Sequence, residues 1–367
     1  MATSLSEEEV LQQYWREFKR RIPYESGNYP YVAARVKAKK AALYPLDTYT
    51  RLLQMEIPQI ARFLGEGPYK EEILALGAQL RGVDLVERAT ANHLAKVFTQ
   101  IIEMSEGHLR DMVARYLDRW DVSNIKTILR GRLYGASAAD IEEDIVAAGS
   151  LHASFLHTLV GKDTVEEVFD ALAGTIYEEA RRRMGDAFDP TKGLAAYEDA
   201  LAHIYYSHLL AEIEPRTEPS RLFHTFVRRE VDVLNLRTLL RVWRTKSTVD
   251  RPVFLEGGLE LAVEELRECV GLDLAGLMGR LSHYSRYGDI VSSLREVEAR
   301  GAAYVERTLE RAQLKAASRH SHLHPLSVLP VLDFVARKTR EVENIRIIAR
   351  GKEHGLPLEA MKELLVV

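Results

Sequence analysis

The chain has little cysteine, proline and glycine, and each shortage narrows the structures that it can adopt. Its 367 residues include 1 Cys, 12 Pro and 22 Gly. The single cysteine, Cys269, excludes an internal disulfide framework and a Cys-x-x-Cys zinc site, and it fits a reducing compartment. An all-β chain needs a turn about every ten residues, and turn-forming residues are too few for that. The composition therefore favours long helices.

The chain also lacks a strong net charge and a long apolar run. Its 50 basic residues oppose 54 acidic ones, a formal net charge of −4, so no global field attracts nucleic acid. The longest stretch without a formal charge, 145–161, contains two histidines, two serines, a threonine and two glycines, which makes it a poor transmembrane helix. The first residues are acidic where a signal peptide is basic. We expect a cytoplasmic protein.

Apolar residues recur with helical spacing along the chain. Ser137 with Asp140 and Thr164 with Glu167 are typical of helix starts. The tracts 86–115 and 195–213 predict helices of several turns, and no alternating stretch is long enough for a strand. We therefore predict an all-α fold.

An internal repeat is the most informative feature. The segments DVSNIKTILRGR at 121–132, DVLNLRTLLRVW at 232–243 and EVENIRIIARGK at 341–352 share an acid, a valine, an asparagine and an arginine six residues after the asparagine. Two sets of markers keep one period: Asn124, Asn235 and Asn344 lie 111 and 109 residues apart, and Glu87, Glu198 and Glu306 lie 111 and 108 apart. The markers predict three units of about 110 residues.

Each repeat asparagine borders the apolar face of its helix. There it can satisfy a neighbouring backbone group or fix which helix packs where, since leaving it unpaired costs roughly 1–3 kcal/mol. Two interpretations of the shared arginines Arg130, Arg241 and Arg350 stay open. These side chains make contacts between helices, or they line a common surface for a partner.

A degenerate copy of the repeat lies at 31–47, with Ala34 in the place of the asparagine. The chain thus begins and ends partway through a unit. We predict an N-terminal helix at 1–28 and three helical repeats at 29–132, 133–243 and 244–367.

Motifs for catalysis and metal binding are missing from the sequence. It contains no phosphate loop, no GxGxxG after a strand, no GxSxG and no HExxH. His320, His322 and His324 could share a face of an extended segment and bind a metal, but their apolar, proline-containing surroundings indicate a break between two helices. Cys269 follows Glu268 in an apolar stretch, which indicates a buried thiol. We predict no catalytic site, cofactor or metal.

Several segments together resemble a known family. The three repeats, the opening YVAARVKA with its LYPL turn and the ending REVENIRIIARGKEHGLP resemble the C subunit of archaeal and bacterial A/V-type ATP synthases, whose eukaryotic counterpart is the d subunit of the vacuolar proton pump. The likeness runs from about residue 31 to the last residues. It implies an all-helical, funnel-shaped molecule of three similar domains about a pseudo-threefold axis.

The resemblance also implies a role. It implies one copy per complex, peripheral to the membrane at its cytoplasmic face, as a non-catalytic part of the rotor. One side docks on the ring of proteolipid subunits, and the other receives the central stalk with its subunits D and F. Torque then passes between head and ring for proton or sodium transport and for ATP synthesis or hydrolysis. A stiff adaptor needs tight seating rather than acid–base groups, which agrees with the missing motifs.

The residues that we predict at contacts with the ring or the stalk lie in the basic N-terminal patch, at the turns and among the shared arginines: Arg35, Lys39, Leu43, Tyr44, Arg130, Leu133, Tyr134, Arg241 and Arg350. We expect no nucleic acid and no small-molecule substrate as a partner. The periodicity alone also allows an unrelated cytoplasmic helical-repeat scaffold. A metal enzyme that uses the three histidines is a second alternative.

Overall fold

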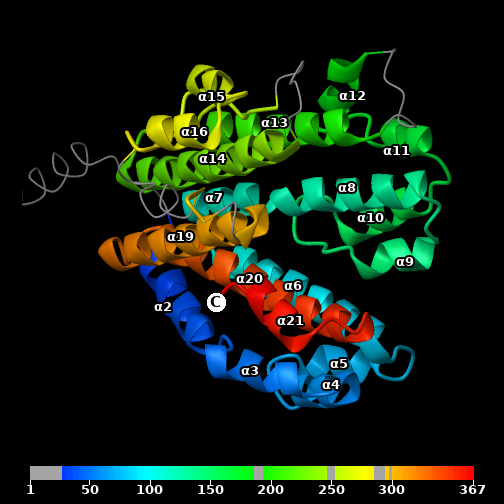
Figure 1. Cartoon of the computed structure of the whole chain (residues 1–367). Coiled ribbons are helices and arrows are strands. Elements are labelled where there is room, and N and C mark those ends of the chain that lie inside the picture. The colour runs from blue at the N-terminus through cyan, green and yellow to red at the C-terminus, as the bar shows by residue number, and fades with distance from the viewer. Residues whose placement is uncertain (1–26, 186–192, 246–252, 285–293, 297–299) are drawn as a thin grey trace, which may run out of the picture.

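The computed structural model describes residues 27–185, 193–245, 253–284, 294–296 and 300–367. Within these ranges every regular element is a helix (Figure 1), which confirms the predicted all-α class. The first half holds α2 (Tyr29–Ala41), α3 (Leu46–Gln54), α4 (Ile57–Gly65), α5 (Lys70–Leu76), α6 (Gly82–Met104), α7 (Gly107–Leu117), α8 (Arg119–Leu133), α9 (Ala138–Glu143), α10 (Ala153–Val160), α11 (Val165–Ala171) and α12 (Glu178–Met184). The second half holds α13 (Ala195–Glu212), α14 (Glu218–Thr245), α15 (Val263–Cys269), α16 (Leu274–Leu281), α19 (Ala302–Leu323), α20 (Leu329–Glu353) and α21 (Leu358–Leu364). The helix predicted at 1–28 falls outside the described residues, apart from its last two positions.

The predicted helix starts are confirmed at the level of single hydrogen bonds. Ser137 Oγ accepts the N–H of Asp140 (3.2 Å), and Asp140 accepts the N–H of Ser137 in return (3.1 Å). Thr164 Oγ1 accepts the N–H of Glu167 (3.2 Å). These bonds satisfy donors that have no partner inside the first turn of a helix.

The tract at 86–115 is not one helix. Helix α6 ends at Met104, and α7 begins at Gly107, whose φ of +55° turns the chain in a way that glycine tolerates best. Asn28 holds the turn: its Nδ2 donates to the carbonyl of Met104 (2.8 Å), and its Oδ1 accepts the N–H of Glu106 (3.0 Å). Apolar periodicity continues across the break and therefore does not reveal it. The helix predicted at 195–213 is confirmed as α13.

The long helices pack in a cyclic order. Helix α8 packs on α13, α14 packs on α19, and α20 packs on α6. Figure 1 shows the last of these pairs, where the red C-terminal part of the chain lies beside cyan α6. The third pair joins α20, near the C-terminal end, to α6, which precedes α8 in the chain. The series of helix contacts therefore forms a closed ring. The funnel shape and the domain limits at 132 and 243 stay predictions.

The N-terminal segment packs against the C-terminal segment. Helices α2, α3 and α4 all contact α20, and α3 also contacts α21 (Figure 1). Ala34 on α2 is exposed, so the degenerate copy of the repeat does not reproduce the buried asparagine. Residues 29–65 therefore act as a cover for α20.

Among the described residues, two hydrophobic cores hold the helices together. The larger core includes α2 to α14, α20 and α21, with Phe98, Tyr116 and Phe334 almost fully buried. The smaller core joins α14, α15, α16 and α19 around Phe254 and Leu309. Burying one such side chain contributes roughly 1.5–3 kcal/mol. Helix α14 contributes to both cores and so connects them.

Candidate functional site

Each repeat asparagine clamps the backbone of the segment that lies 20 to 22 residues further on. In every case the side-chain amide donates to the carbonyl and accepts the N–H of a single residue, at 2.7–3.1 Å: Asn124 with Val146, Asn235 with Leu255 and Asn344 with Val366. All three asparagines are buried. The prediction that they satisfy backbone groups is confirmed, and the two bonds set the path of the clamped segment.

The acid three residues before each asparagine holds a second stretch of backbone. Asp121 accepts the N–H groups of Ser150 (2.9 Å) and Leu151 (3.2 Å). Asp232 accepts those of Glu260 (2.9 Å) and Leu261 (3.2 Å). The clamps thus repeat with the period that the sequence shows.

The third acid, Glu341, receives its donor from the other end of the chain. Its Oε2 accepts the N–H of Tyr44 (2.6 Å), 297 residues earlier, and its Oε1 accepts the hydroxyl of Tyr69 (2.7 Å). Asp121 likewise accepts a tyrosine hydroxyl, that of Tyr177 (3.3 Å). Tyr69 and Tyr177 directly precede α5 and α12. The acid that accepts a backbone N–H and a tyrosine hydroxyl thus recurs at Glu341, where it joins the C-terminal part of the chain to the N-terminal segment.

Burial changes the protonation of the first acid. Desolvation, and after it the neighbouring Asp118 carboxylate, raise the pKa of Asp121 from 3.8 to about 7. The N–H groups of Leu151 and Ser150 and the hydroxyl of Tyr177 lower the pKa but only partly oppose the desolvation. This clamp is therefore partly protonated near neutral pH.

Two of the shared arginines cross from one unit to the next. Arg130 on α8 holds Glu198 on α13 in a bidentate pair, at 2.6 and 2.5 Å. Arg350 on α20 holds Glu87 on α6, with 2.8 Å between Nη2 and Oε2. Arg241 is exposed on α14, which packs on the next unit in the same way. The contact between helices is confirmed for Arg130 and Arg350, and a partner surface along these arginines stays a prediction.

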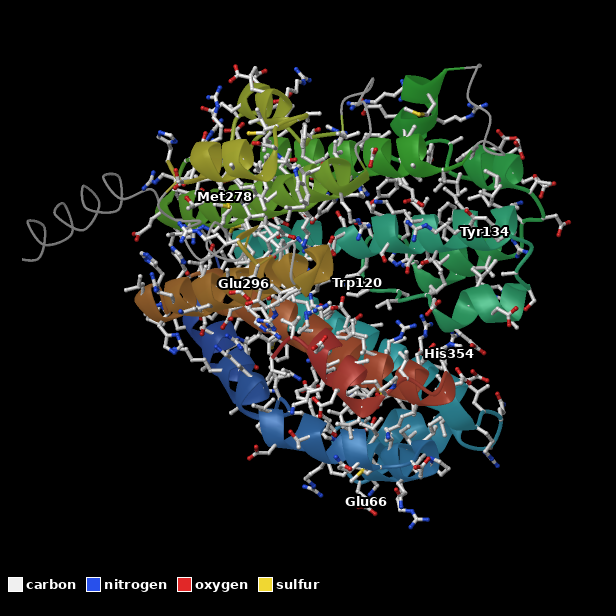
Figure 2. The ribbon with its side chains drawn as sticks, in the orientation of Figure 1. Glu66, Trp120, Tyr134, Met278, Glu296 and His354 are labelled. Atoms are coloured by element: carbon white, nitrogen blue, oxygen red, sulfur yellow. The ribbon has the colours of Figure 1, made fainter. Side chains whose placement is uncertain are left out.

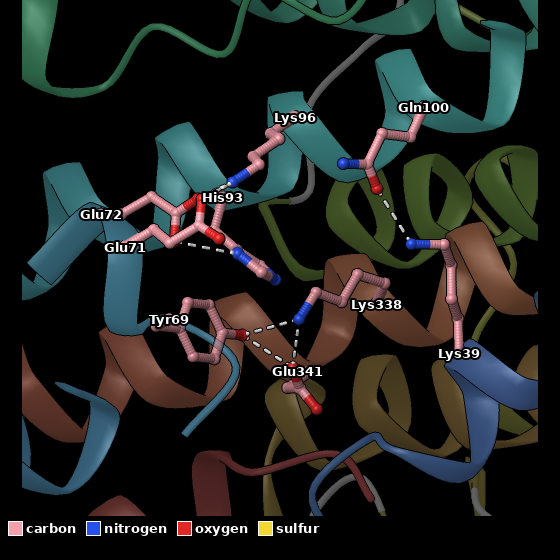
Figure 3. A network of polar contacts seen from close by, with 9 residues as sticks. All are labelled: Lys39, Tyr69, Glu71, Glu72, His93, Lys96, Gln100, Lys338 and Glu341. Carbon is pink, nitrogen blue, oxygen red and sulfur yellow. Dashed lines mark hydrogen bonds and ion pairs between the residues drawn. The ribbon is translucent and has the colours of Figure 1, made fainter. Parts of the chain in front are cut away.

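A buried polar cluster lies where α20 meets the N-terminal segment (Figure 3). Lys338 Nζ donates to Glu341 Oε1 (2.6 Å) and to the Tyr69 hydroxyl (3.0 Å), and it lies 4.4 Å from the centre of the Tyr69 ring. Beside the cluster, His93 Nδ1 lies 3.2 Å from Glu72 Oε2. Burial lowers the pKa of Lys338, which the Glu341 carboxylate opposes. Burial also lowers the pKa of His93 to about 4, so the ring is neutral at pH 7.

The predicted contact residues at the turns are mostly not free surface. Leu43, Tyr44 and Leu133 are partly buried and pack against the larger core. Tyr44 contacts the ring of Phe63, with 5.7 Å between centroids. Tyr134 differs from the others: it is 81% exposed, just after the last residue of α8 (Figure 2). Leu43, Tyr44 and Leu133 are thus partly covered by the protein and Tyr134 is open, and contact of these residues with the ring or the stalk stays a prediction.

The predicted basic patch is divided between water and the protein. Arg35 and Lys37 are exposed on α2. Lys40 is half-buried and pairs with Asp333 on α20 (2.5 Å). Lys39 is also half-buried and donates to Gln100 on α6 (3.0 Å). Only part of the patch is thus available to a partner.

The three histidines do not gather around a metal. His320 and His322 lie in the last turns of α19, where Nδ1 of each is bonded to the backbone carbonyl four residues earlier. Residues two apart on a helix point in different directions. The predicted break between two helices is confirmed at 324–328. Within the described ranges, no three His, Cys, Asp or Glu side chains come close enough to hold a metal ion.

Cys269 lies at the last position of α15 and is buried, as predicted. Burial raises the pKa of its thiol. Among the residues that the structure describes, none of the helices has the length and apolar character needed to cross a membrane.

The sequence interpretation missed the cluster of Tyr69, Lys338 and Glu341. In the sequence, Glu341 stands out only as the acid of the third repeat, and its position in the repeat is the one feature that could have pointed to the cluster. Tyr69 and Lys338 lie outside every repeat marker. Tyr69 lies 269 residues before Lys338 and 272 residues before Glu341. The local periodicity of the sequence therefore does not predict these contacts.

Comparisons with known proteins agree with this architecture. A family described as "ATP synthase (C/AC39) subunit" matches residues 32–364. The chain is 38% identical over 361 residues to the A-type ATP synthase C subunit of Methanococcoides burtonii, covering 98% of this chain and 99% of the relative. It is also 38% identical over 346 residues to the C subunit of Methanosarcina acetivorans, covering 93% and 94%, and 36% identical over 345 residues to that of Haloferax volcanii, covering 93% and 98%.

The chain belongs to the family of ATP synthase C/AC39 subunits. These relatives are named as one subunit of an ATP synthase, which agrees with the prediction that the chain is not itself an enzyme. The alternative of a scaffold unrelated to ATPases is thereby overturned.

Proposed function

We propose that this protein is a non-catalytic rotor subunit of an A/V-type ATP synthase, placed between the central stalk and the ring of proteolipid subunits. It transmits torque between the two during proton or sodium transport and ATP synthesis or hydrolysis. It lies at the cytoplasmic face of the membrane, peripheral to it and in one copy per complex. Subunits D and F of the central stalk are its partners on one side, and the proteolipid ring is its partner on the other.

The observation that carries this proposal is the cyclic closure of the helices. A part that transmits torque has to resist shear between its units. Here α8, α14 and α20 each pack on the first long helix of the next unit. Buried clamps and inter-unit ion pairs such as Arg130 with Glu198 add polar registry to this packing.

Docking requires side chains that remain outside the closed structure. Tyr134 is the most exposed large apolar or aromatic residue that the structure describes, and it follows the end of α8. Aromatic side chains of this kind often dominate the energy of an interface. Tyr134 is therefore the first position to test for contact with the ring or the stalk.

Co-sedimentation tests the proposal. The wild-type chain should be retained both by the purified proteolipid ring and by the D–F stalk. The Y134A variant should keep its helical circular dichroism and lose retention by one of the two. The matched control is L74A, which removes a side chain that is 66% exposed on α5. Failure of the wild-type chain to bind either partner overturns the rotor assignment, whereas unchanged binding of Y134A overturns only the role of Tyr134.

A further inference from the structure

The turn between α19 and α20 presents two leucines to the outside. Leu323 is 65% exposed at the last position of α19 (orange in Figure 1), and Leu326 is 63% exposed three residues later. Ser327 holds the turn: its hydroxyl donates to the carbonyl of His324 (2.8 Å) and accepts the N–H of Leu329 (3.2 Å). Leu329 is itself buried in the larger core. The two exposed leucines are therefore held in place by an anchored turn.

A row of cations leads to this turn along α19. Lys315, Arg319 and Leu323 follow one another at intervals of four residues, so they are neighbours on one face of the helix, and all three are exposed. The sequence has no Asp or Glu from 311 to 332. Among the described residues, no carboxylate pairs with Lys315 or Arg319. This face of α19 therefore has a positive charge that the protein does not neutralise.

The charges on the side of α2 and α20 do not reverse this balance. Lys40 Nζ on α2 lies 3.5 Å from Ser318 Oγ on α19. The carboxylate that pairs with Lys40 is that of Asp333, which is fully buried and also pairs with Arg337 (2.9 Å). Two cations thus share one carboxylate on this side.

The charges on the side of α14 do not reverse it either. Arg229 Nη1 lies 3.5 Å from His320 Nδ1, and Glu218 Oε1 lies 3.9 Å from His324 Nδ1. Glu230, next to Arg229 in the sequence, is buried and already paired with an arginine of α8 (2.6 Å). Of the carboxylates on the two sides, only that of Glu218 is exposed. The surface around the end of α19 therefore stays positive.

We propose that residues 315–326, the α19 corner, dock on a bilayer of anionic phospholipid. Leu323 and Leu326 enter the boundary between the headgroups and the acyl chains, and the charged groups of Lys315 and Arg319 contact the lipid phosphates. Exposed leucines beside unneutralised cations match a surface that is apolar within and negatively charged outside. An acidic protein surface would match the cations but not the leucines. The inference goes beyond the rotor assignment, which puts the protein at the membrane without a contact to lipid.

Co-sedimentation of the full chain with vesicles tests the α19 corner. Neither the ring nor the stalk is present, so a failure here is distinct from a failure of the rotor assignment. The wild-type chain should bind vesicles of equal parts phosphatidylglycerol and phosphatidylcholine more tightly than vesicles of phosphatidylcholine alone, and added salt should weaken this binding. The K315Q/R319Q variant should lose about 25-fold in affinity, which is about fivefold per cation. The L323S/L326S variant should lose about tenfold or more.

The matched control is K70Q/L74S on α5, which removes an exposed lysine and a leucine that is 66% exposed. It should bind as the wild type does, and all variants should keep the wild-type midpoint of thermal unfolding because every substituted side chain is exposed. The proposal is overturned if the wild-type chain binds both kinds of vesicle equally, or if K315Q/R319Q binds as well as the control. Full binding by L323S/L326S also overturns it, since the cations then act alone, as they would on an acidic protein.

Discussion

Arg350 forms a bidentate ion pair with Glu87, which lies 263 residues earlier in the chain. The pair joins α20 to α6 and repeats the relationship of Arg130 on α8 to Glu198 on α13. Both arginines stand six residues after a clamp asparagine. The same local pattern therefore joins neighbouring parts of the chain at Arg130. At Arg350 it joins the last part of the chain to the first and so closes the molecule.

The closing pair should contribute measurably but modestly to stability. Arg350 is half-exposed and Glu87 is buried, so R350A and E87A should each lower the free energy of unfolding by about 1 kcal/mol or somewhat more. The double variant should cost about 0.5–1 kcal/mol less than the two losses added together. Urea unfolding of the four proteins measures this coupling. The control is E353A, at an exposed position of α20, and strictly additive losses would contradict a direct interaction.

Two glycines lie so close to the clamp acids that a side chain has no room. A Cβ on Gly149 would lie less than 3.0 Å from Asp121 Oδ1, and a Cβ on Gly258 less than 3.0 Å from Asp232 Oδ1. We expect G258A to destabilise the protein by about 1–3 kcal/mol, because the clamp or the loop has to shift. The control is G279A in α16, where no atom lies within 4 Å and a stabilisation of about 0.5–1 kcal/mol is expected. Thermal unfolding separates the two, and a G258A protein as stable as the wild type would refute the close approach.

The buried pair of Lys338 and Glu341 should behave as a unit. Both side chains are less than 5% exposed, so K338M or E341M alone leaves an uncompensated buried charge and should cost about 3–5 kcal/mol. The double variant K338M/E341M should recover much of that loss, because it removes both charges. Chemical unfolding of the three variants is the measurement. A double variant less stable than either single one would show that the hydrogen bonds of Glu341 to Tyr44 and Tyr69 outweigh the charges.

Asp121 should make stability depend on pH. Its pKa is about 7 in the folded protein against 3.8 for a free side chain, so the folded state binds the proton more tightly than the unfolded chain. The stabilisation from this proton is fully present below about pH 4 and is lost as the pH rises through about 7, for a total of about 4 kcal/mol. The D121N variant cannot titrate and should lack this decline.

Urea unfolding at pH 4.5 and pH 8 tests that prediction. The difference between the wild-type chain and D121N should change between the two pH values, with the wild type losing more stability on going to pH 8. D170N, at an exposed position of α11, is the control and should follow the wild type. A difference that does not change with pH would place the pKa of Asp121 outside this range.

Much of the fold was predictable because it depends on short-range patterns. Helix starts such as Ser137 with Asp140 need only residues three positions apart. The break at Ser105 was not predictable, because it depends on Asn28, which reaches Met104 and Glu106 from an unrelated segment. The partial burial of Tyr44 was not predictable for a similar reason, since its backbone N–H is bonded to Glu341, 297 residues later in the chain.

The sequence by itself determined the helical class, the period of about 110 residues and the presence of an acid, an asparagine and an arginine on each repeated helix. These properties follow from spacing along one helix. Only the tertiary structure decided what those side chains bind. Asn124 and Glu341 hold backbone N–H groups, which every residue but proline has, so the identity of the bound residue leaves no mark in the sequence. The closure of the last unit by the N-terminal segment became visible only once the chain was folded.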